Sequence, residues 1–275
     1  NGDLTRAEVH LHTNNPGAAL EYSLEMSEIS GVKIDNLAEM KRDLEQKEEP
    51  EKETEIEKEF GMVTVSLGEG FNEFFRDLNV DQIVEGGQTM NPSVDDILHA
   101  INRVPAEKVF VLPNNGNVVF AANQAAKMSS REVHVIPTKN VAMGIAAAIA
   151  FQPDKSADEN AGIMSEAAEH IKTATITYAV RDSEYEGVVM KQGDIIGMHN
   201  GAITKSGNSI RDVAMEIMKD IVTDEDELIT VYYGSDITEE DAAALTAELE
   251  SEYPDCDVEY HRGGQPLYYY IISVE

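Results

Sequence analysis

Cysteine, tryptophan and basic residues are scarce in this chain. Its 275 residues include one cysteine, Cys256, and no tryptophan. A single cysteine excludes an internal disulfide and a zinc site built from several cysteines, so the sequence fits a reducing compartment and predicts a cytoplasmic protein. No stretch approaches the roughly 18 consecutive apolar residues that a membrane-spanning helix needs. The first residues, Asn1 to Arg6, show no signal-peptide pattern.

Positive charge is equally scarce. The chain has 21 Lys and Arg residues against 52 Asp and Glu, which gives a formal net charge of −31 at pH 7. A protein with this net charge repels phosphates, which argues against nucleic acid and anionic membranes as partners. Two explanations stay open. The acidic surface serves solubility alone, or one acidic face attracts a basic protein partner by electrostatic steering.

The chain opens with a segment too small to fold alone. Residues 1–34 predict a strand, a helix over 18–30 and a second strand, which cannot bury a core. We therefore expect the tail of a larger domain, and a chain that is a fragment. Residues 35–60 are dense in Glu and Lys and include Pro50, a composition typical of a flexible charged linker.

From residue 61 onward, short apolar strands alternate with helices. Over residues 61–152 this alternation predicts a parallel sheet with right-handed crossovers. One of its helices, over 141–151, is apolar nearly all round, which predicts burial because it is too short to span a membrane. Residues 153–275 combine helices with alternating strands and an Asn200-Gly201 hairpin signal, which predicts a mixed α+β subdomain. The predicted fold class is α/β with two subdomains and a truncated amino-terminal appendage.

Two polar turns at strand ends are the first candidates for a ligand site. One runs from Gln88 to Ser93, and its Asn91-Pro92 pair predicts the start of a helix. The other runs from Asn114 to Asn117 and follows the next strand. In α/β sheets such turns meet at the carboxyl edge, where ligand crevices form. The candidate crevice residues are Thr89, Asn91, Ser93, Asn114, Asn115 and Asn117.

Three other candidates have plainer alternatives. His10 and His12 share one face of a strand, which suits metal ligation or a proton relay, but strand histidines are often incidental. The segment from His261 to Gln265 either faces the crevice or forms a plain hairpin turn. Cys256 lies between two aspartates, with no basic neighbour to lower its pKa, and we interpret it as an ordinary residue.

Longer strings in the sequence resemble one family. They are VHLHTNNPGAALEY at residues 9–22, the acidic segment that follows, GGQTMNPS at 86–93 and LPNNGN at 112–117. Together they closely resemble the catalytic subunit of bacterial two-component fatty acid kinases, also described through its dihydroxyacetone-kinase-like ATP-binding domain. The resemblance runs through nearly the whole chain.

The resemblance implies a subunit of three parts. An amino-terminal domain binds Mg-ATP, a central domain dimerises and carries catalytic residues, and a carboxyl-terminal domain follows. The family's V-H-x-H histidines match His10 and His12, which would act with a cysteine upstream of Asn1, so they would be catalytic only in the full-length homodimer. The fragment itself should hold no metal or cofactor and should be inactive as a kinase.

The resemblance also implies a role for the last domain. In the family this domain is similar to the acyl-carrying partner, whose DegV fold holds a fatty acid carboxylate in its polar turns. Asparagines replace small hydroxyl residues here, which favours turns remodelled for structure or docking over a retained lipid site. We expect docking of a DegV-type, fatty-acid-carrying partner with a basic face, so that the full enzyme makes acyl-phosphate for phospholipid synthesis. The expected docking residues are Glu69, Glu85, Asp95 and Asp96.

Two alternatives remain open for this domain. It could be a DegV-like module that binds lipid or a small anion in the crevice. It could also be a component of a dihydroxyacetone-type kinase.

Overall fold

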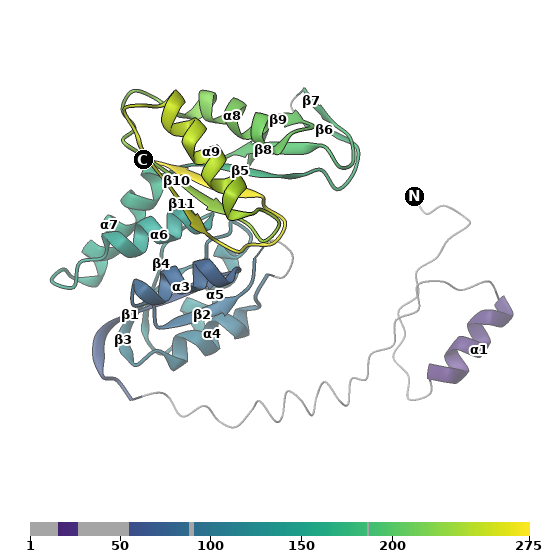
Figure 1. Ribbon diagram of the computed structural model, residues 1–275. Helices are drawn as coiled ribbons and strands as arrows, with labels where there is room; N and C mark the ends of the chain where they lie inside the picture. Colours follow the sequence, from purple (N-terminus) through teal and green to yellow (C-terminus); the bar gives the residue numbers. More distant parts are fainter. Residues whose placement is uncertain (1–15, 27–54, 88–90, 186) are drawn as a thin grey trace. The chain divides into compact units, whose positions relative to one another are not determined.

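The computed structural model describes residues 16–26, 55–87, 91–185 and 187–275 (Figure 1). The chain divides into two units, residues 1–52 and 53–275. In the first unit the described part is one helix, α1 (Pro16–Met26), within a region where the sequence predicts a helix. The predicted strands that flank this helix and most of the predicted linker lie outside the described residues.

The second unit begins with a four-stranded parallel sheet. Its strands have the spatial order β2-β1-β3-β4, as the alternation of strands and helices predicts. Their bounds are β1 (Lys58–Ser66), β2 (Gln82–Glu85), β3 (Ala106–Leu112) and β4 (Glu132–Val135). The accompanying helices are α3 (Glu69–Asp77), α4 (Val94–Arg103), α5 (Val119–Met128), α6 (Val141–Ala150) and α7 (Ala157–His170).

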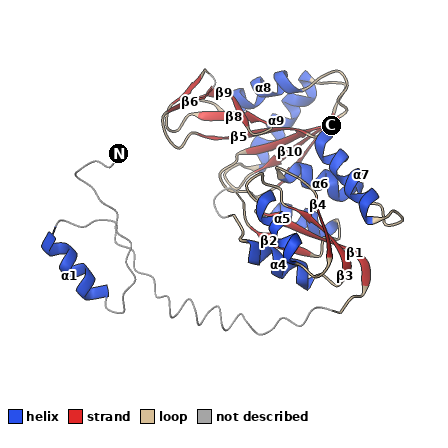
Figure 2. Ribbon diagram, turned by 180° about the vertical axis from the view of Figure 1, so that it is seen from behind, coloured by secondary structure: helices blue, strands red, loops and turns tan. Residues whose placement is uncertain are grey.

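Helices cover both faces of this sheet (Figure 2). Successive side chains of a strand point to opposite faces. Val63 and Val65 of β1 therefore pack in the core formed with α4 and α5. Met62 of β1 and Phe110 of β3 pack in a second core formed with α3, α6 and α7.

A six-stranded mixed sheet forms the second half. Its strand order is β11-β10-β12-β5-β8-β9, and only the β10–β11 pair is parallel. The strands are β5 (Lys172–Tyr178), β8 (Ile195–His199), β9 (Ala202–Gly207), β10 (Leu228–Tyr233), β11 (Asp257–Arg262) and β12 (Tyr270–Val274). One face packs against α8 (Ile210–Ile221) and α9 (Glu239–Glu252). A separate hairpin pairs β6 (Ser183–Tyr185) with β7 (Val188–Met190).

The two subdomains share one apolar core. Tyr232 of β10 and Ile271 of β12 belong to the same buried cluster as the helices α3, α6 and α7. The ring centroids of Phe71 and Tyr232 lie 5.1 Å apart, and those of Phe74 and His261 lie 5.0 Å apart. This continuous contact through α3 joins the two sheets into a single packed body.

The predicted α/β fold class with two subdomains is confirmed. None of the helices in the described ranges is long and apolar enough to cross a bilayer. One local prediction was wrong: α4 begins after Ser93, so Asn91 is not its cap. The sequence interpretation also missed β11 and the β6–β7 hairpin.

Candidate functional site

The turn after β1 packs directly against the connection between β11 and β12. A Cβ on Gly68, whose φ is 122°, would lie 2.5 Å from the Gly263 carbonyl oxygen and 2.9 Å from the Gln265 nitrogen. A Cβ on Gly70 would also overlap backbone there. The Phe71 N–H donates a hydrogen bond to the Gly263 carbonyl oxygen at 3.2 Å. The second subdomain's backbone therefore fills the space beside the β1 turn.

Asn114 fills the space at the end of β3. Its φ is 53°, a left-handed conformation that asparagine tolerates better than most residues. Its Nδ2 donates to Thr64 Oγ1 at 2.8 Å and to the Val65 carbonyl oxygen at 3.0 Å, while its backbone N–H donates to Thr138 Oγ1 at 3.0 Å. Its Oδ1 lies so close to Gly144 of α6 that no Cβ fits at that position. The Asn114 amide therefore braces β1 against α6.

The other described turn residues also serve local structure or lie in solvent. Asn115 is buried, and its Oδ1 accepts from the Asn117 N–H at 2.9 Å. Ser93 Oγ accepts from the Asp96 N–H at 3.1 Å, and Asp96 Oδ2 accepts from the Ser93 N–H at 2.9 Å. This reciprocal pair is a capping box that starts α4. The side chains of Asn91 and Asn117 are exposed.

Three predicted site residues lie outside the described residues. They are Thr89 of the first polar turn and the two histidines His10 and His12. Their predicted roles stay predictions.

The four predicted docking carboxylates lie at the carboxyl edge of the parallel sheet, and all are exposed. Glu69 begins α3 directly after β1, and Glu85 ends β2 opposite Ser66 of β1. Asp95 and Asp96 lie in the first turn of α4, where the helix dipole favours negative charge. The edge thus presents an acidic surface, which we call the acidic edge and define by these four carboxylates.

Two polar atoms near the end of β1 are buried without a hydrogen-bond partner among the described residues. They are Ser66 Oγ and Asn114 Oδ1. Ser66 is 3% exposed and lies two residues after Thr64, so both point to the same side of the strand. An unpaired buried polar group costs about 1–3 kcal/mol. Ser66 is the feature here that favours a small polar ligand.

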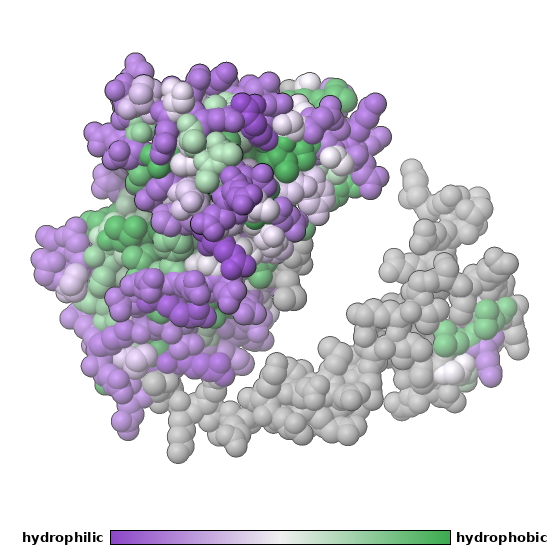
Figure 3. Space-filling model, viewed as in Figure 1, coloured by the Kyte–Doolittle hydropathy of each residue, from purple (hydrophilic) through white to green (hydrophobic). Residues whose placement is uncertain are grey.

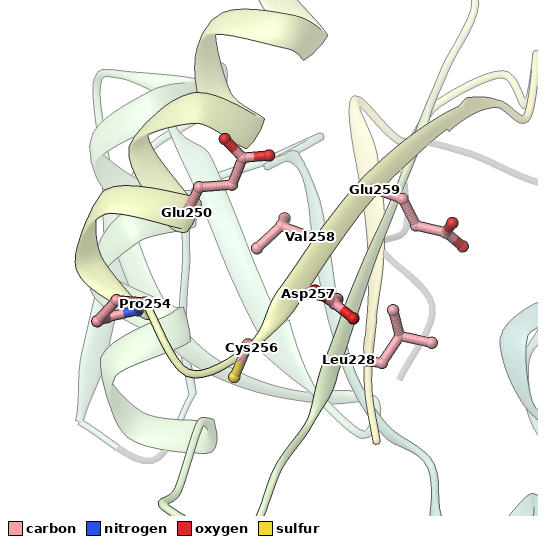
Figure 4. Close-up of a pocket in the computed structure, with 7 residues that line it drawn as sticks. All are labelled: Leu228, Glu250, Pro254, Cys256, Asp257, Val258 and Glu259. Atoms are coloured by element: carbon pink, nitrogen blue, oxygen red, sulfur yellow. The ribbon is translucent and has the colours of Figure 1, made fainter.

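A hollow of about 580 Å³ lies beside the loop between α9 and β11 (Figure 4). Glu250 of α9 and Cys256 border it, and Asp257 and Glu259 project from the opposite side of β11 to Val258. Burial, and then the surrounding carboxylates, raise the pKa of the Cys256 thiol. This hollow therefore holds a protonated thiol, which is a poor nucleophile.

A larger hollow of about 800 Å³ runs along α6, and we call it the α6 groove. Its apolar wall is α6, and its floor is the face of the mixed sheet opposite α8 and α9. Figure 3 shows an exposed hydrophobic area over α6 and α7, bordered by hydrophilic residues. Its lining residues include Ile145, Ile149, Thr230, Glu259, Ser273 and Glu275.

The segment from His261 to Gln265 lies between the subdomains. His261 packs edge-on against Phe74, and Gln265 Nε2 donates to the Tyr232 carbonyl oxygen at 3.1 Å. The preceding strand β11 alternates charged and apolar residues over Asp257–Tyr260, and that signal could have identified it.

Among the described residues, no group of three or more His, Cys, Asp or Glu side chains is placed to hold a metal ion.

A parallel α/β subdomain fused to a mixed α+β subdomain is the architecture of DegV-type proteins. The DegV family protein Cg2579 from Corynebacterium glutamicum superposes with a TM-score of 0.59 at 15% identity, over 78% of this chain and 96% of that one. The Streptococcus pneumoniae fatty acid kinase (Fak) B3 protein, loaded with linoleic acid, superposes with a TM-score of 0.53 at 10% identity, over 79% and 99%. At these identities the likeness shows the fold alone.

Sequence comparison identifies the family within that fold. The model for the carboxyl-terminal domain of FakA-like fatty acid kinase proteins matches residues 61–275, and the model for the middle domain of the same family matches residues 2–44. The chain belongs to this FakA-like fatty acid kinase family, as its sequence motifs predict. Protein YloV of Bacillus subtilis is 38% identical over 276 residues, which cover 99% of this chain and 50% of YloV. The chain therefore spans about half the length of the curated relatives it matches.

Proposed function

We propose that residues 61–275 form a docking module for a DegV-type, fatty-acid-carrying protein, and not a second lipid-binding module. The observation that carries the proposal is that polar side chains of the two turns make hydrogen bonds within the protein. The Asn114 amide bonds Thr64 and Val65, and the Ser93 hydroxyl caps a helix. With these groups engaged and the β1 turn packed against backbone, the remaining way to recognise an acyl carrier is through an outer surface.

The acidic edge is the surface that we propose for the first contact with the partner. The chain's net charge of −31 attracts a basic face over distance, and the acidic edge concentrates exposed carboxylates at one end of the parallel sheet. A single exposed ion pair contributes only about 0–1 kcal/mol. Several together raise the association rate and make it sensitive to salt.

In the full-length protein, we propose, docking presents the bound fatty acid for phosphorylation by Mg-ATP, with acyl-phosphate as product and a homodimer as the working form. Membership of the FakA-like fatty acid kinase family supports this reaction. His10 and His12 are the catalytic candidates in this chain. Replacing either with alanine in the full-length enzyme should abolish acyl-phosphate formation and leave the unfolding temperature unchanged, and near-normal turnover in both variants would refute the assignment.

Binding to the fatty-acid-loaded DegV-type protein of the same bacterium tests the docking function. We expect affinity that falls steeply between low and high ionic strength. A triple variant Glu69→Lys, Glu85→Lys and Asp95→Lys should bind about tenfold more weakly. A control reversal at exposed Glu239 and Glu240, in the first turn of α9, should bind within about twofold of the parent. Binding that ignores salt, and a triple variant that binds as well as the parent, would rule out this role.

The buried Ser66 hydroxyl favours a second candidate function, the binding of a small anion or a lipid carboxylate. A hydroxyl 3% exposed with no partner among the described residues is a donor that a carboxylate could satisfy. Native mass spectrometry of the chain with oleic acid distinguishes the two functions. Stoichiometric binding that Ser66→Ala removes and Ser93→Ala leaves intact would favour the ligand site.

A further inference from the structure

We propose that the α6 groove is the place where the docking module binds its partner tightly, and that it takes an amphipathic helix of a protein. One side of that helix is apolar and packs on α6, and its Lys or Arg side chains reach Glu259 and Glu275. The inference rests on the proposed docking function and places the tight contact away from the acidic edge.

The apolar wall of the groove fits a helix. All ten residues of α6, VAMGIAAAIA, are apolar or glycine. Ala142, Ile145, Ala146, Ile149 and Ala150 line the groove at spacings of three and four, so they form a continuous ridge along the helix. Alanines in such a ridge let a second helix approach closely, with ridges packing into grooves. Ala142 and Ile145 are 3% and 6% exposed, so the part of this wall that is open to a partner lies toward the end of α6, at Ala146, Ile149 and Ala150.

Ile149 marks the open part of this wall. Its side chain is 65% exposed, while Ile145, one turn earlier, is 6% exposed and packs in the shared core. Contiguous exposed apolar surface bordered by polar residues is typical of protein interaction sites. The hydrophobic area over α6 and α7 in Figure 3 is such a surface.

The floor of the groove is polar and ordered by the sheet register. Thr230 of β10 lies opposite Glu259 of β11 on one side and opposite Ser273 of β12 on the other. The three side chains therefore form one row across neighbouring strands. Thr230 Oγ1 lies 3.3 Å from Glu259 Oε1, and Thr230 and Ser273 are 4% and 2% exposed.

The charge of the lining calls for a basic occupant. Asp226 is held by Lys172, with 2.6 Å between Oδ2 and Nζ, so these two charges cancel. Glu225, Glu259 and Glu275 remain, and the basic groups beside them are two histidines: His170 in the lining, and His261, whose Nε2 lies 3.2 Å from Glu259 Oε1. Burial, and then the charge of Glu259, raise the pKa of the Glu275 carboxyl. A Lys or Arg of a partner placed between Glu259 and Glu275 would relieve this repulsion.

The same lining disfavours other occupants. A fatty acid carboxylate or an acyl-phosphate carries negative charge and would be repelled by the carboxylates of Glu259 and Glu275. A second copy of this chain has a net charge of −31 and would bring more negative charge to an acidic floor. An apolar helix with basic side chains satisfies both the α6 wall and the floor.

Two matched pairs of variants test the inference on the 275-residue chain, with the oleic-acid-loaded DegV-type protein of the same bacterium as probe. Ile149→Lys removes the apolar anchor, and Val189→Lys on β7 is its control because the parent side chains are 65% and 66% exposed. Glu259→Lys reverses a floor charge. Its control is Glu132→Lys on β4. Glu259 contacts His261 and Glu132 contacts His134, in each case the histidine two residues later, and the two carboxylate side chains are 52% and 51% exposed.

We expect Ile149→Lys to weaken binding about tenfold or more, the effect of losing one buried aliphatic side chain. Glu259→Lys should weaken it about three- to tenfold, with the loss shrinking at high salt. Both controls should stay within about twofold of the parent. Circular dichroism and the unfolding temperature check that all four variants fold.

Three results would overturn the inference. Parent-like binding by Ile149→Lys and Glu259→Lys, with weaker binding by the acidic-edge triple variant, would leave the docking function standing and refute the groove. Absence of binding by the parent chain would refute both. A parent chain that sediments as a dimer, and an Ile149→Lys variant that sediments as a monomer with unchanged partner binding, would show that a second copy fills the groove.

Discussion

The structural role assigned to Asn114 can be tested by shortening its side chain. Asn114→Ala removes the amide that donates to Thr64 Oγ1 at 2.8 Å and to the Val65 carbonyl oxygen at 3.0 Å. It also places alanine at a φ of 53°, where a residue other than glycine or asparagine is strained. Both effects act on the folded state, so the variant should unfold more easily while keeping its fold.

The magnitude follows from these two effects. Two lost hydrogen bonds contribute about 2 kcal/mol together, and the left-handed backbone adds about 1 kcal/mol. A loss of about 3 kcal/mol lowers the unfolding temperature by roughly 6–12 °C in a domain of this size. Asn114→Gly loses the same hydrogen bonds without the backbone strain, so it should be about 1 kcal/mol more stable than the alanine variant.

Asn114→Asp adds a charge to the same position. The new carboxylate would face the Val65 carbonyl oxygen, so its pKa should be raised in the folded state. With the folded pKa above the unfolded one, the folded state binds the proton more tightly, and this variant should regain stability as pH falls from 7 toward about 4. Urea unfolding and calorimetry measure all three variants. An Asn114→Ala variant within about 0.5 kcal/mol of the parent would refute the bracing role.

Three further predictions concern packing and titration. Gly70→Ala should destabilise the chain by about 2 kcal/mol or more in urea unfolding because its Cβ would overlap the backbone of β11; Gly162→Ala, which has open space in α7, should be neutral or stabilising. Burial alone would raise the pKa of the Asp226 carboxyl. The ion pair with Lys172 and the hydrogen bonds from Thr223 lower this pKa by more than burial raises it, so it lies below its usual value. Asp226→Asn should therefore cost about 2 kcal/mol at pH 7, a difference that shrinks as pH falls below about 4 through the depressed folded pKa. Cys256, whose thiol pKa is raised by burial, should react with iodoacetamide more slowly than free cysteine at about pH 7.5 and show no burst of reactivity.

Local sequence signals predicted most of the secondary structure. The Asn200-Gly201 pair is the two-residue connection between β8 and β9, because both residues take the positive φ that a tight hairpin turn needs. Thr238, with Asp241 three residues later, is a local helix-start signal of the same kind, and the Asp241 N–H donates to Thr238 Oγ1 at 3.1 Å at the start of α9. In each case the decisive interaction lies within a few residues of sequence.

The sequence-based predictions failed where two helix-start patterns lay close together, and where a strand pattern was weak. Asn91-Pro92 and Ser93 are both plausible helix starts, and Ser93 prevails because Asp96 lies three residues later and completes a capping box. Strand β11 was missed because its exposed positions are charged, which weakens its hydrophobic pattern. The alternation of charged and apolar residues along β11 was the remaining sequence evidence for a strand.

The site was less predictable than the fold because its contacts are distant in sequence. Asn114 meets Thr64 across 50 residues, and Gln265 meets Tyr232 across 33. The sequence placed asparagines at the turn but could not say that their amides would be used inside the protein. The α6 groove depends on two helices, α6 and α7, and on strands of the mixed sheet, which come together only in the folded chain.

The helix α6 joins the sequence argument to the structural one. A helix that is apolar all round is expected to be buried on every side, and α6 is too short to be buried by a membrane. The fold buries Ala147 and Ala148 on one side but leaves Ile149 65% exposed on another. On the proposed docking function, a partner protein covers that side, and the acidic floor beside it favours a basic one. The composition of one ten-residue helix therefore bears on recognition as much as on stability.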